Sequence, residues 1–206
     1  MSEKVHRAIK AHDLDTLARL LAAGDDPNER STEQPQWSPL SAAIYEVTEG
    51  GDIEAVALLL RHGANCNAWE GNRDATPLLR ALWDGHRDAA LMLLAAGADP
   101  NVRSDVGDVP ISMCVVRGDL KMAATLLRAG AAKTIEECPG DGTGCNALGH
   151  AAALLDIEMI RLLLAWGASI TAWDIDRRTA RERLPERTEE NAEKYDLALE
   201  LLSPKS

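Results

Sequence analysis

Large aromatic side chains are scarce in this sequence of 206 residues. Phenylalanine is absent, and aromatic residues as a whole make up 3% of the chain. A buried core therefore has to be built mainly from Ala, Leu, Ile and Val, which suit small helices that pack closely together. The length allows one domain, or an array of short units that share one elongated core.

Clusters of basic residues and long apolar runs are also lacking. Asp and Glu outnumber Lys and Arg by 33 to 22, which gives a formal net charge of −11. Binding to a phosphate backbone needs a concentrated positive surface, so we expect neither nucleic acid nor a membrane as a partner. The first ten residues have no apolar stretch of the signal-peptide type, and no run is long enough to span a bilayer. We therefore expect a cytoplasmic protein.

Cysteine is too scarce and too scattered for a disulfide framework, because the chain has only Cys66, Cys114, Cys138 and Cys145. Cys138 and Cys145, with His150 nearby, are residue types that bind zinc, but no fourth ligand is apparent. A metal site, a loop disulfide and ordinary reduced thiols stay open, and we favour the thiols. The glycine-rich insertion at 136–145 that carries these cysteines is either neutral variation in a surface loop or a functional addition.

Catalytic chemistry leaves no recognisable pattern in the sequence. No Ser or Cys can be paired with a base, and the acidic pairs stand at turns or helix starts, where carboxylates are common. The Gly-rich stretch 140–144 contains no Lys and follows no apolar strand, as a phosphate-binding loop would. We predict a protein that is not an enzyme and that binds no cofactor or metal ion.

An internal repeat is the main positive signal. An apolar run followed by a small-residue corner and a glycine occurs five times, and those glycines are Gly24, Gly63, Gly97, Gly130 and Gly167. They are 39, 34, 33 and 37 residues apart, which indicates a period near 33 with insertions. A glycine directly after a helix supplies the left-handed backbone that ends it.

A helix start precedes four of these corners. The starts are Ser38-Pro39-Leu40, Thr76-Pro77-Leu78, Val109-Pro110-Ile111 and Asn146-Ala147-Leu148. A Ser or Thr hydroxyl can cap the first turn, and Pro fits the first helical position, whose N–H has no helical partner. Each unit thus predicts a pair of short helices, which cannot bury its apolar face alone and has to stack on its neighbours.

This pattern resembles the ankyrin repeat, most completely over residues 76–101, where the Thr-Pro-Leu start, Gly85-His86 and the Gly97-Ala98-Asp99-Pro100-Asn101 exit fall in register. The resemblance implies an all-α repeat solenoid of helix-turn-helix units joined by hairpin-like turns, with about four to five repeats and a C-terminal capping unit. We expect one ankyrin-repeat domain over 1–206. Its units are an N-terminal capping repeat at 1–30, repeats at 31–68, 69–103, 104–136 and 137–173, and a C-terminal cap at 174–206.

The resemblance also implies a binding surface, because ankyrin proteins typically bind through their turn tips and the solvent side of their inner helices. We call these positions the inner face. In this register the candidate partner-binding residues are Trp37, Tyr45, Glu46, Trp69, Asn72, Arg73, Trp83, Asp84, Arg103, Asp105, Asp108, Arg117, Trp173 and Asp176. Four of the five tryptophans are among them, either as interface anchors or as rings that pack the repeats.

Charge on the inner face suggests the chemistry of the partner. The five turn stretches 29–37, 68–75, 102–108, 135–145 and 172–178 hold eleven acids and five bases, a net charge of −6. Such a surface favours a basic protein partner, although acidic surfaces also simply keep proteins soluble. We expect a non-catalytic protein–protein interaction module, monomeric when free, with an immunity or inhibitor protein that neutralises a bacterial toxin as one possible role. The alternative is an adaptor, scaffold or host-directed effector that links partners without inhibiting them.

Overall fold

The computed structural model describes residues 3–33, 35–71, 74–139 and 144–204. These residues form eleven α-helices, two short 3-10 helices and no strand beyond one isolated bridge between Glu70 and Ala75. The α-helices are α1 (Glu3–Lys10), α2 (Leu14–Ala22), α3 (Pro39–Thr48), α4 (Glu54–Arg61), α5 (Pro77–Trp83), α6 (Arg87–Ala95), α7 (Pro110–Val116), α8 (Leu120–Arg128), α9 (Ala147–Ala153), α10 (Ile157–Ala165) and α11 (Ala192–Leu201). The 3-10 helices are η1 (Ala131–Thr134) and η2 (Ala180–Arg183).

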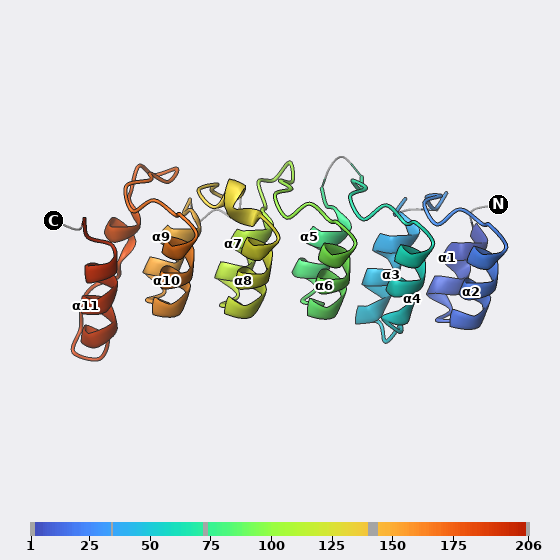
Figure 1. Cartoon of the computed structure of the whole chain (residues 1–206), viewed down its shortest axis with the longest axis horizontal. Coiled ribbons are helices and arrows are strands. Elements are labelled where there is room, and N and C mark those ends of the chain that lie inside the picture. Colours follow the sequence, from blue (N-terminus) through green and yellow to red (C-terminus); the bar gives the residue numbers. More distant parts are fainter. Residues whose placement is uncertain (1–2, 34, 72–73, 140–143, 205–206) are drawn as a thin grey trace. The chain divides into compact units, whose positions relative to one another are not determined.

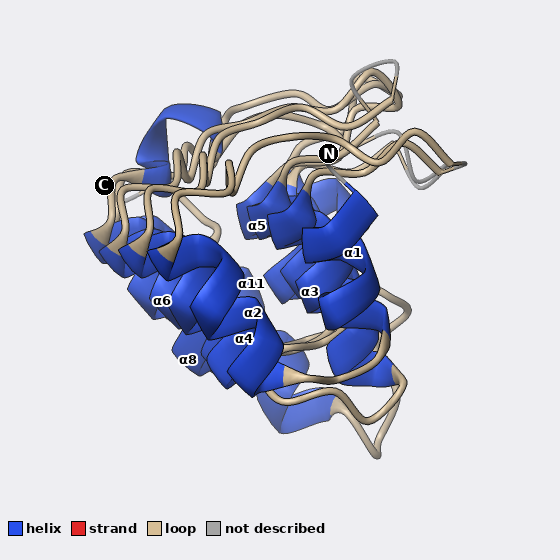
Figure 2. Ribbon diagram, turned by 90° about the vertical axis from the view of Figure 1, so that its right-hand side faces the viewer, coloured by secondary structure: helices blue, strands red, loops and turns tan. Residues whose placement is uncertain are grey.

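The helices pack as antiparallel pairs within two compact units, Met1–Asp105 and Val106–Ser206 (Figure 1). In the first unit, the inner helices α1, α3 and α5 pack in one layer and the outer helices α2, α4 and α6 in the other (Figure 2). In the second unit, α7, α9 and η2 form the inner layer, and α8, α10 and α11 form the outer layer. The predicted all-α repeat fold is confirmed.

The helix starts use the predicted capping chemistry in three of four cases. The side chains of Ser38, Thr76 and Asn146 accept hydrogen bonds from backbone N–H groups in the first turns of α3, α5 and α9. Val109 stands at the same position of α7 and has no side-chain acceptor. The three predicted Pro residues occupy the first turns of α3, α5 and α7.

The corner glycines end the outer helices as predicted. Gly24, Gly63, Gly97, Gly130 and Gly167 all have φ between 87° and 102°. A side chain is rarely tolerated in this left-handed region, which explains why the chain returns to glycine at this position of each unit.

The end of the chain departs from a regular helix pair. The unit that begins at Thr179 has a 3-10 turn, η2, in place of an inner α-helix. Thr179 and Glu182 form a capping box at its start, but Pro185 lies two residues after its end. Because Pro lacks an N–H and restricts the residue before it, the turn cannot extend into a full helix. The final helix α11 then packs against α10.

Hydrogen bonds at the repeat exits connect neighbouring units. Asn28 donates from its amide to the Gly63 carbonyl (3.1 Å) and accepts from the Asn65 N–H (2.7 Å). Asn67 repeats the arrangement one unit later, with the Gly97 carbonyl and the Asp99 N–H. The Asn of the exit motif therefore fixes the spacing between successive repeats.

The buried His6 links the first inner helix to the turn that follows the first repeat. Its Nε2 lies 3.1 Å from the Glu29 carbonyl oxygen. Burial lowers the pKa of His6, against smaller opposing effects from the Glu29 hydrogen bond and the nearby Glu3. The folded protein therefore keeps His6 neutral at a pH where the unfolded chain, with a His pKa of about 6.5, takes up a proton.

Stability is expected to fall as the pH drops through 6.5, because the unfolded state then binds the extra proton and the folded state does not. One proton accounts for at most about 1.4 kcal/mol per pH unit. Urea unfolding of the wild type and His6→Gln between pH 7.5 and 5.5 measures the effect. The variant should show the shallower pH dependence, and equal slopes would contradict the assignment to His6.

Candidate functional site

Four side chains of the first unit form a stack that joins the second and third repeats. The Trp37 and Tyr45 rings lie 5.1 Å apart between centroids, with an angle of 56° between their planes. The Arg80 guanidinium carbon lies 4.8 Å from the Trp37 ring centroid and 5.5 Å from that of Trp83. We call Tyr45, Trp37, Arg80 and Trp83 the Trp–Arg stack. Its cation–π contacts hold two of the predicted tryptophans in fixed positions.

Local sequence explains how the stack forms. Arg80 and Trp83 are three residues apart on α5, so they lie on the same side of that helix. Trp37 directly precedes Ser38, the N-cap of α3, and Tyr45 lies in α3 itself. Because α3 packs against α5, the rings of one repeat meet the cation of the next.

Two polar atoms beside this stack are buried without a hydrogen-bond partner among the described residues. They are Nε of Arg80 and Oδ2 of Asp84, the residue at the C-cap of α5. No ion pair joins the two side chains, although they are four residues apart on one helix. Buried atoms left in this way reduce stability by about 1–3 kcal/mol each, so their presence on a candidate binding surface needs an explanation.

A cavity of about 180 Å³ opens next to the stack. It is lined by His6, Lys10, Ser31, Pro35, Trp37, Ala42, Tyr45 and Glu46. Small-molecule sites usually measure about 300–1,000 Å³, so this cavity is closer to the size of a single side chain. It is smaller than the usual site for a metabolite.

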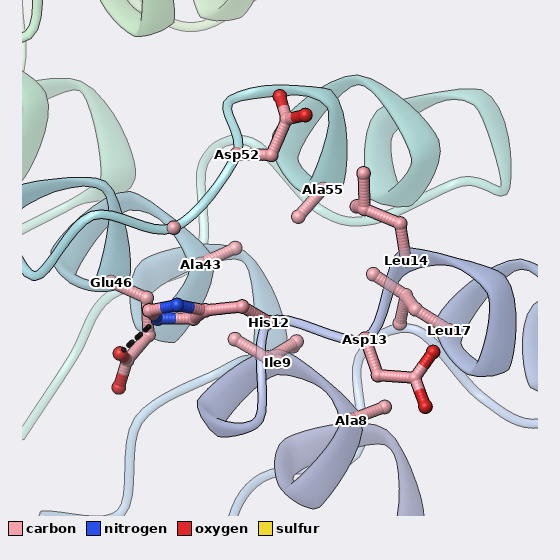
Figure 3. Close-up of a pocket in the computed structure, with 11 residues that line it drawn as sticks. Ala8, Ile9, His12, Asp13, Leu14, Leu17, Ala43, Glu46, Asp52 and Ala55 are labelled. Atoms are coloured by element: carbon pink, nitrogen blue, oxygen red, sulfur yellow. Dashed lines mark hydrogen bonds and ion pairs between the residues drawn. The ribbon is translucent and has the colours of Figure 1, made fainter.

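Glu46 is held from a second side by the neighbouring repeat. His12 Nε2 lies 3.0 Å from Glu46 Oε2, and Figure 3 shows this contact at the edge of a smaller cavity that Ile9, Leu17 and Ala55 also line. That cavity measures about 10 Å³, which is at the lower limit of the space that one water needs. Glu46 therefore takes part in packing between the first and second repeats, as well as lying at the edge of the larger cavity.

Trp69 lies half-buried in a turn that is anchored by buried charge. Its carbonyl accepts a hydrogen bond from the Arg30 guanidinium. The adjacent Glu70 is buried, and its carboxylate accepts from the Ser38 hydroxyl (2.6 Å), the Ser41 hydroxyl (2.7 Å) and Arg30 (3.3 Å). The turn that carries Trp69 is thus fixed to the start of α3 in the preceding repeat.

In the second unit, the turn after α10 exposes two large apolar side chains. Trp173 is 68% exposed and Ile175 is 66% exposed, while Asp174 between them is buried. The Arg183 guanidinium donates to Asp174 Oδ2 and to Asp176 Oδ2, both at 2.6 Å. We call 173–176 the anchored turn, because its apolar side chains project from a fixed backbone.

Hydrogen bonding sets the charge of the buried carboxylate in this turn. Burial alone would raise the pKa of Asp174, but donors from Arg183, Arg178 and Asp176 outweigh it and bring the pKa below its usual value. The same contacts raise the pKa of Arg183. Asp174 and Arg183 are therefore ionised at neutral pH, and the single positive charge of Arg183 offsets one of the two negative charges of Asp174 and Asp176.

The other predicted residues fall into three groups. Asn72 and Arg73 lie outside the described residues. Arg103 and Asp105 are exposed in the turn at the end of the first unit. In the second unit, Asp108 is half-buried and Arg117 is exposed at the C-cap of α7.

Sequence reasoning missed Arg80, Glu70 and Arg183 as parts of this surface. Arg80 had a local signal, since it is the charged residue of the otherwise apolar helix α5 and lies three residues before Trp83. Glu70 and Arg183 had no local signal. Glu70 pairs with Arg30, which is 40 residues away in the sequence, and Arg183 pairs with Asp174, which is 9 residues away. Two of the eleven acids in the turn stretches, Glu70 and Asp174, are buried in internal ion pairs.

The cysteine loop offers no metal site within the part of the chain that the structure describes. No group of three or more His, Cys, Asp or Glu residues converges there. The four cysteines are free thiols, and burial raises the pKa of Cys138, which keeps it protonated near neutral pH. Residues 140–143 of this loop lie outside the described residues. Across the described ranges, no helix is long and apolar enough to cross a membrane.

Comparison with known proteins places this geometry in a family. A family model described as ankyrin repeats in three copies matches residues 5–104. An ankyrin repeat-containing protein of Treponema pallidum (strain Nichols) is 34% identical over 124 residues, which cover 60% of this chain and 39% of that protein. The B-cell lymphoma 3 protein homolog of Mus musculus is 30% identical over 99 residues, which cover 48% of this chain and 22% of that protein. The chain thus spans well under half the length of these relatives.

Solved structures agree over nearly the whole chain. An ankyrin repeat domain from Acinetobacter baumannii AYE superimposes with a TM-score of 0.77 at 23% identity, covering 96% of this chain and 95% of that one. At this identity the likeness shows the fold alone. The family match over 5–104, together with the corner glycines and the capped helix starts, shows that this chain carries ankyrin repeats.

Proposed function

We propose that this chain binds a basic protein through its inner face. Ankyrin repeats are generally non-catalytic modules for protein–protein interaction, and one observation supports that use here. Most exposed large apolar side chains among the described residues lie on turn tips or at inner-helix ends, namely Tyr45, Val106, Val116, Leu154, Trp173 and Ile175. Among the described residues, the outer helices and their ends expose only Leu91 and Trp166 of this kind. Apolar surface left in water on one kind of element is typical of an interface.

The expected charge of the partner rests on a smaller set of acids than the sequence count suggested. The net charge of −11 supports attraction of a basic protein over long range. At short range, Glu70, Asp174 and Asp176 are already paired with Arg30 or Arg183. The side chains of Asp84 and Asp105 make no ion pair or hydrogen bond with the described residues, so they remain the acids best able to meet a partner's cation.

The anchored turn provides the test. Trp173→Ala is expected to weaken capture of the partner by about 2 kcal/mol, because a largely exposed indole on a fixed backbone loses little entropy on binding. The measurement uses the protein as bait in a lysate of its native cell, with the captured protein identified and its affinity for both forms determined by calorimetry. Trp166→Ala removes an exposed Trp from the outer side and serves as the control.

Equal affinities of the wild type and Trp173→Ala would place the interface elsewhere. The activity of the captured partner in the complex then distinguishes the two proposed roles, inhibition and scaffolding. Loss of the partner's own activity at saturating ratios would support an immunity or inhibitor protein, acting in the cytoplasm where thiols stay reduced. Full activity of the bound partner would support an adaptor.

A further inference from the structure

Asp84 occupies a position where a carboxylate is unfavourable for the free protein. It stands at the C-cap of α5, where the helix dipole already places partial negative charge. One of its oxygens, Oδ2, is buried, and no donor among the described residues reaches that oxygen. Both effects destabilise the folded chain, so packing of the repeats does not account for this residue.

The cation closest in sequence on the same helix is engaged elsewhere. Arg80 is four residues before Asp84, a spacing at which opposite charges on a helix usually pair. Here the Arg80 guanidinium is held over the Trp37 and Trp83 rings, at 4.8 and 5.5 Å. The stack therefore keeps Arg80 away from Asp84 and leaves the carboxylate without an internal counter-ion.

Several other helix ends of this chain place charge where the helix dipole favours it. Carboxylates cap the N-terminal ends of α2, α8 and α10 through Asp13, Asp119 and Asp156, where the helix dipole favours negative charge. At the end of α7, the position that matches Asp84 one repeat later, the residue is Arg117, which the dipole favours. Glu49 at the matching C-cap of α3 is also an acid, but it is exposed to water, whereas Asp84 has a carboxylate oxygen that is buried without a donor.

We propose that Asp84 is the acceptor for one Lys or Arg side chain of the basic partner, with the Trp–Arg stack supplying the apolar contact beside it. This inference rests on the proposed function and narrows it to a single charge. The partner's cation would meet the accessible part of this half-buried carboxylate and would offset the negative end of the helix. The Asp84 carboxylate is available in the free protein, because the stack holds the Arg80 guanidinium over the Trp rings and keeps it from pairing with Asp84.

The test compares two variants of equal net charge. Asp84→Asn removes the proposed acceptor, and Asp88→Asn removes an exposed acid from the first turn of α6, where the helix dipole favours it. The probe is a hexa-arginine peptide at low ionic strength, with hexa-glutamate as the reverse-charge control. Calorimetry gives the affinities, backbone amide shifts of residues 83–86 locate the contact, and urea unfolding gives the stabilities.

Asp84→Asn is expected to weaken hexa-arginine binding about tenfold, whereas Asp88→Asn stays within about twofold of the wild type. Asp84→Asn should also be at least as stable as the wild type, and Asp88→Asn slightly less stable. Equal weakening by both variants would mean that net charge alone attracts the peptide, which would overturn the proposal. A marked loss of stability in Asp84→Asn would overturn it as well, because it would show a structural role.

Failure of this inference can be told apart from failure of the proposed function. The inference depends on Asp84 and the arginine peptide, whereas the inner-face interface depends on Trp173 and the captured partner. If Trp173→Ala weakens capture of the partner but Asp84→Asn changes neither capture nor peptide binding, the acceptor assignment is wrong and the interface stands. If Asp84→Asn alone weakens both, the acceptor stands and the interface does not include the anchored turn.

Discussion

Replacing Glu70 by Ala is expected to lower the free energy of unfolding by about 3–5 kcal/mol. The Glu70 carboxylate is buried and accepts hydrogen bonds from the Ser38 N–H, the Ser38 and Ser41 hydroxyls and the Arg30 guanidinium. Removing it leaves several buried donors at the start of α3 without an acceptor. It also deprives Arg30 of its counter-ion. Urea unfolding followed by circular dichroism measures the loss.

A second variant separates charge from shape at this position, and a surface variant serves as the control. Glu70→Gln keeps the side-chain length and one carbonyl acceptor but loses the charge, so its cost should be smaller, about 1–3 kcal/mol. Glu54→Ala removes an exposed acid that pairs with Arg61 on the surface of α4, and should change stability by less than about 1 kcal/mol. A Glu70→Ala variant as stable as Glu54→Ala would show that the buried network contributes nothing.

The Glu70 network also bears on binding, because Trp69 precedes Glu70 in the same turn. Arg30 contacts both the Trp69 carbonyl and the Glu70 carboxylate. Loss of Glu70 should therefore release the turn as well as destabilise the repeat. A weakened affinity in Glu70→Ala would say nothing about Trp69 as a contact residue, so Trp69 has to be tested by its own substitution.

The repeat architecture was predictable because its signals are local. A glycine after an apolar run, as at Gly97, ends a helix through its own backbone freedom. A Thr-Pro pair, as at Thr76, begins one through hydroxyl capping and a fixed φ angle. These effects act within a few residues and recur at a fixed period, so the sequence alone predicted both helices of most units. The last unit is also governed by a local effect, because Pro185 limits its inner element to a 3-10 turn.

The candidate site was predictable only in outline. The register placed Trp37 and Trp83 on the inner face, but it could not show that Arg80 would lie between them. Such contacts depend on side-chain direction and on the packing of α3 against α5, which periodicity does not encode. The charge count overstated the number of surface acids for a related reason. It treated Glu70 and Asp174 as surface acids, although each is buried by a partner from another element.

Arg183→Ala is expected to lower stability by about 3 kcal/mol, because it leaves the buried Asp174 without its counter-ion. The Arg183 side chain is 12% exposed and that of Asp174 is 1% exposed, so solvent screens their interaction weakly. Calorimetric unfolding at pH 7 measures the loss. Arg187→Ala breaks a pair with Asp196 in which both side chains are exposed, and serves as the control. A loss no larger than that of the control would contradict the prediction.

The same pair predicts an acid-sensitive contribution to stability. The pKa of Asp174 is lower in the folded protein than its usual value of 3.8, so the pair stabilises the fold above that pH. As the pH falls from about 4 through the lower folded pKa, the unfolded chain binds the proton first and this contribution is lost. The difference in stability between wild type and Arg183→Ala should therefore shrink below pH 4. A difference that stays constant between pH 7 and 3 would contradict the ion pair.

Arg183 also provides a test of whether the fixed backbone of the anchored turn contributes to binding. If Arg183 acts on binding by holding the backbone on either side of Asp174, its effect has to pass through Trp173 and Ile175. Affinities of Trp173→Ala, Arg183→Ala and the double variant form a cycle that measures this dependence. The double variant should lose less affinity than the two single losses added together, because a turn without Trp173 gains less from being held. Strictly additive losses would mean that Arg183 and Trp173 contribute to binding independently, and that the anchoring serves stability alone.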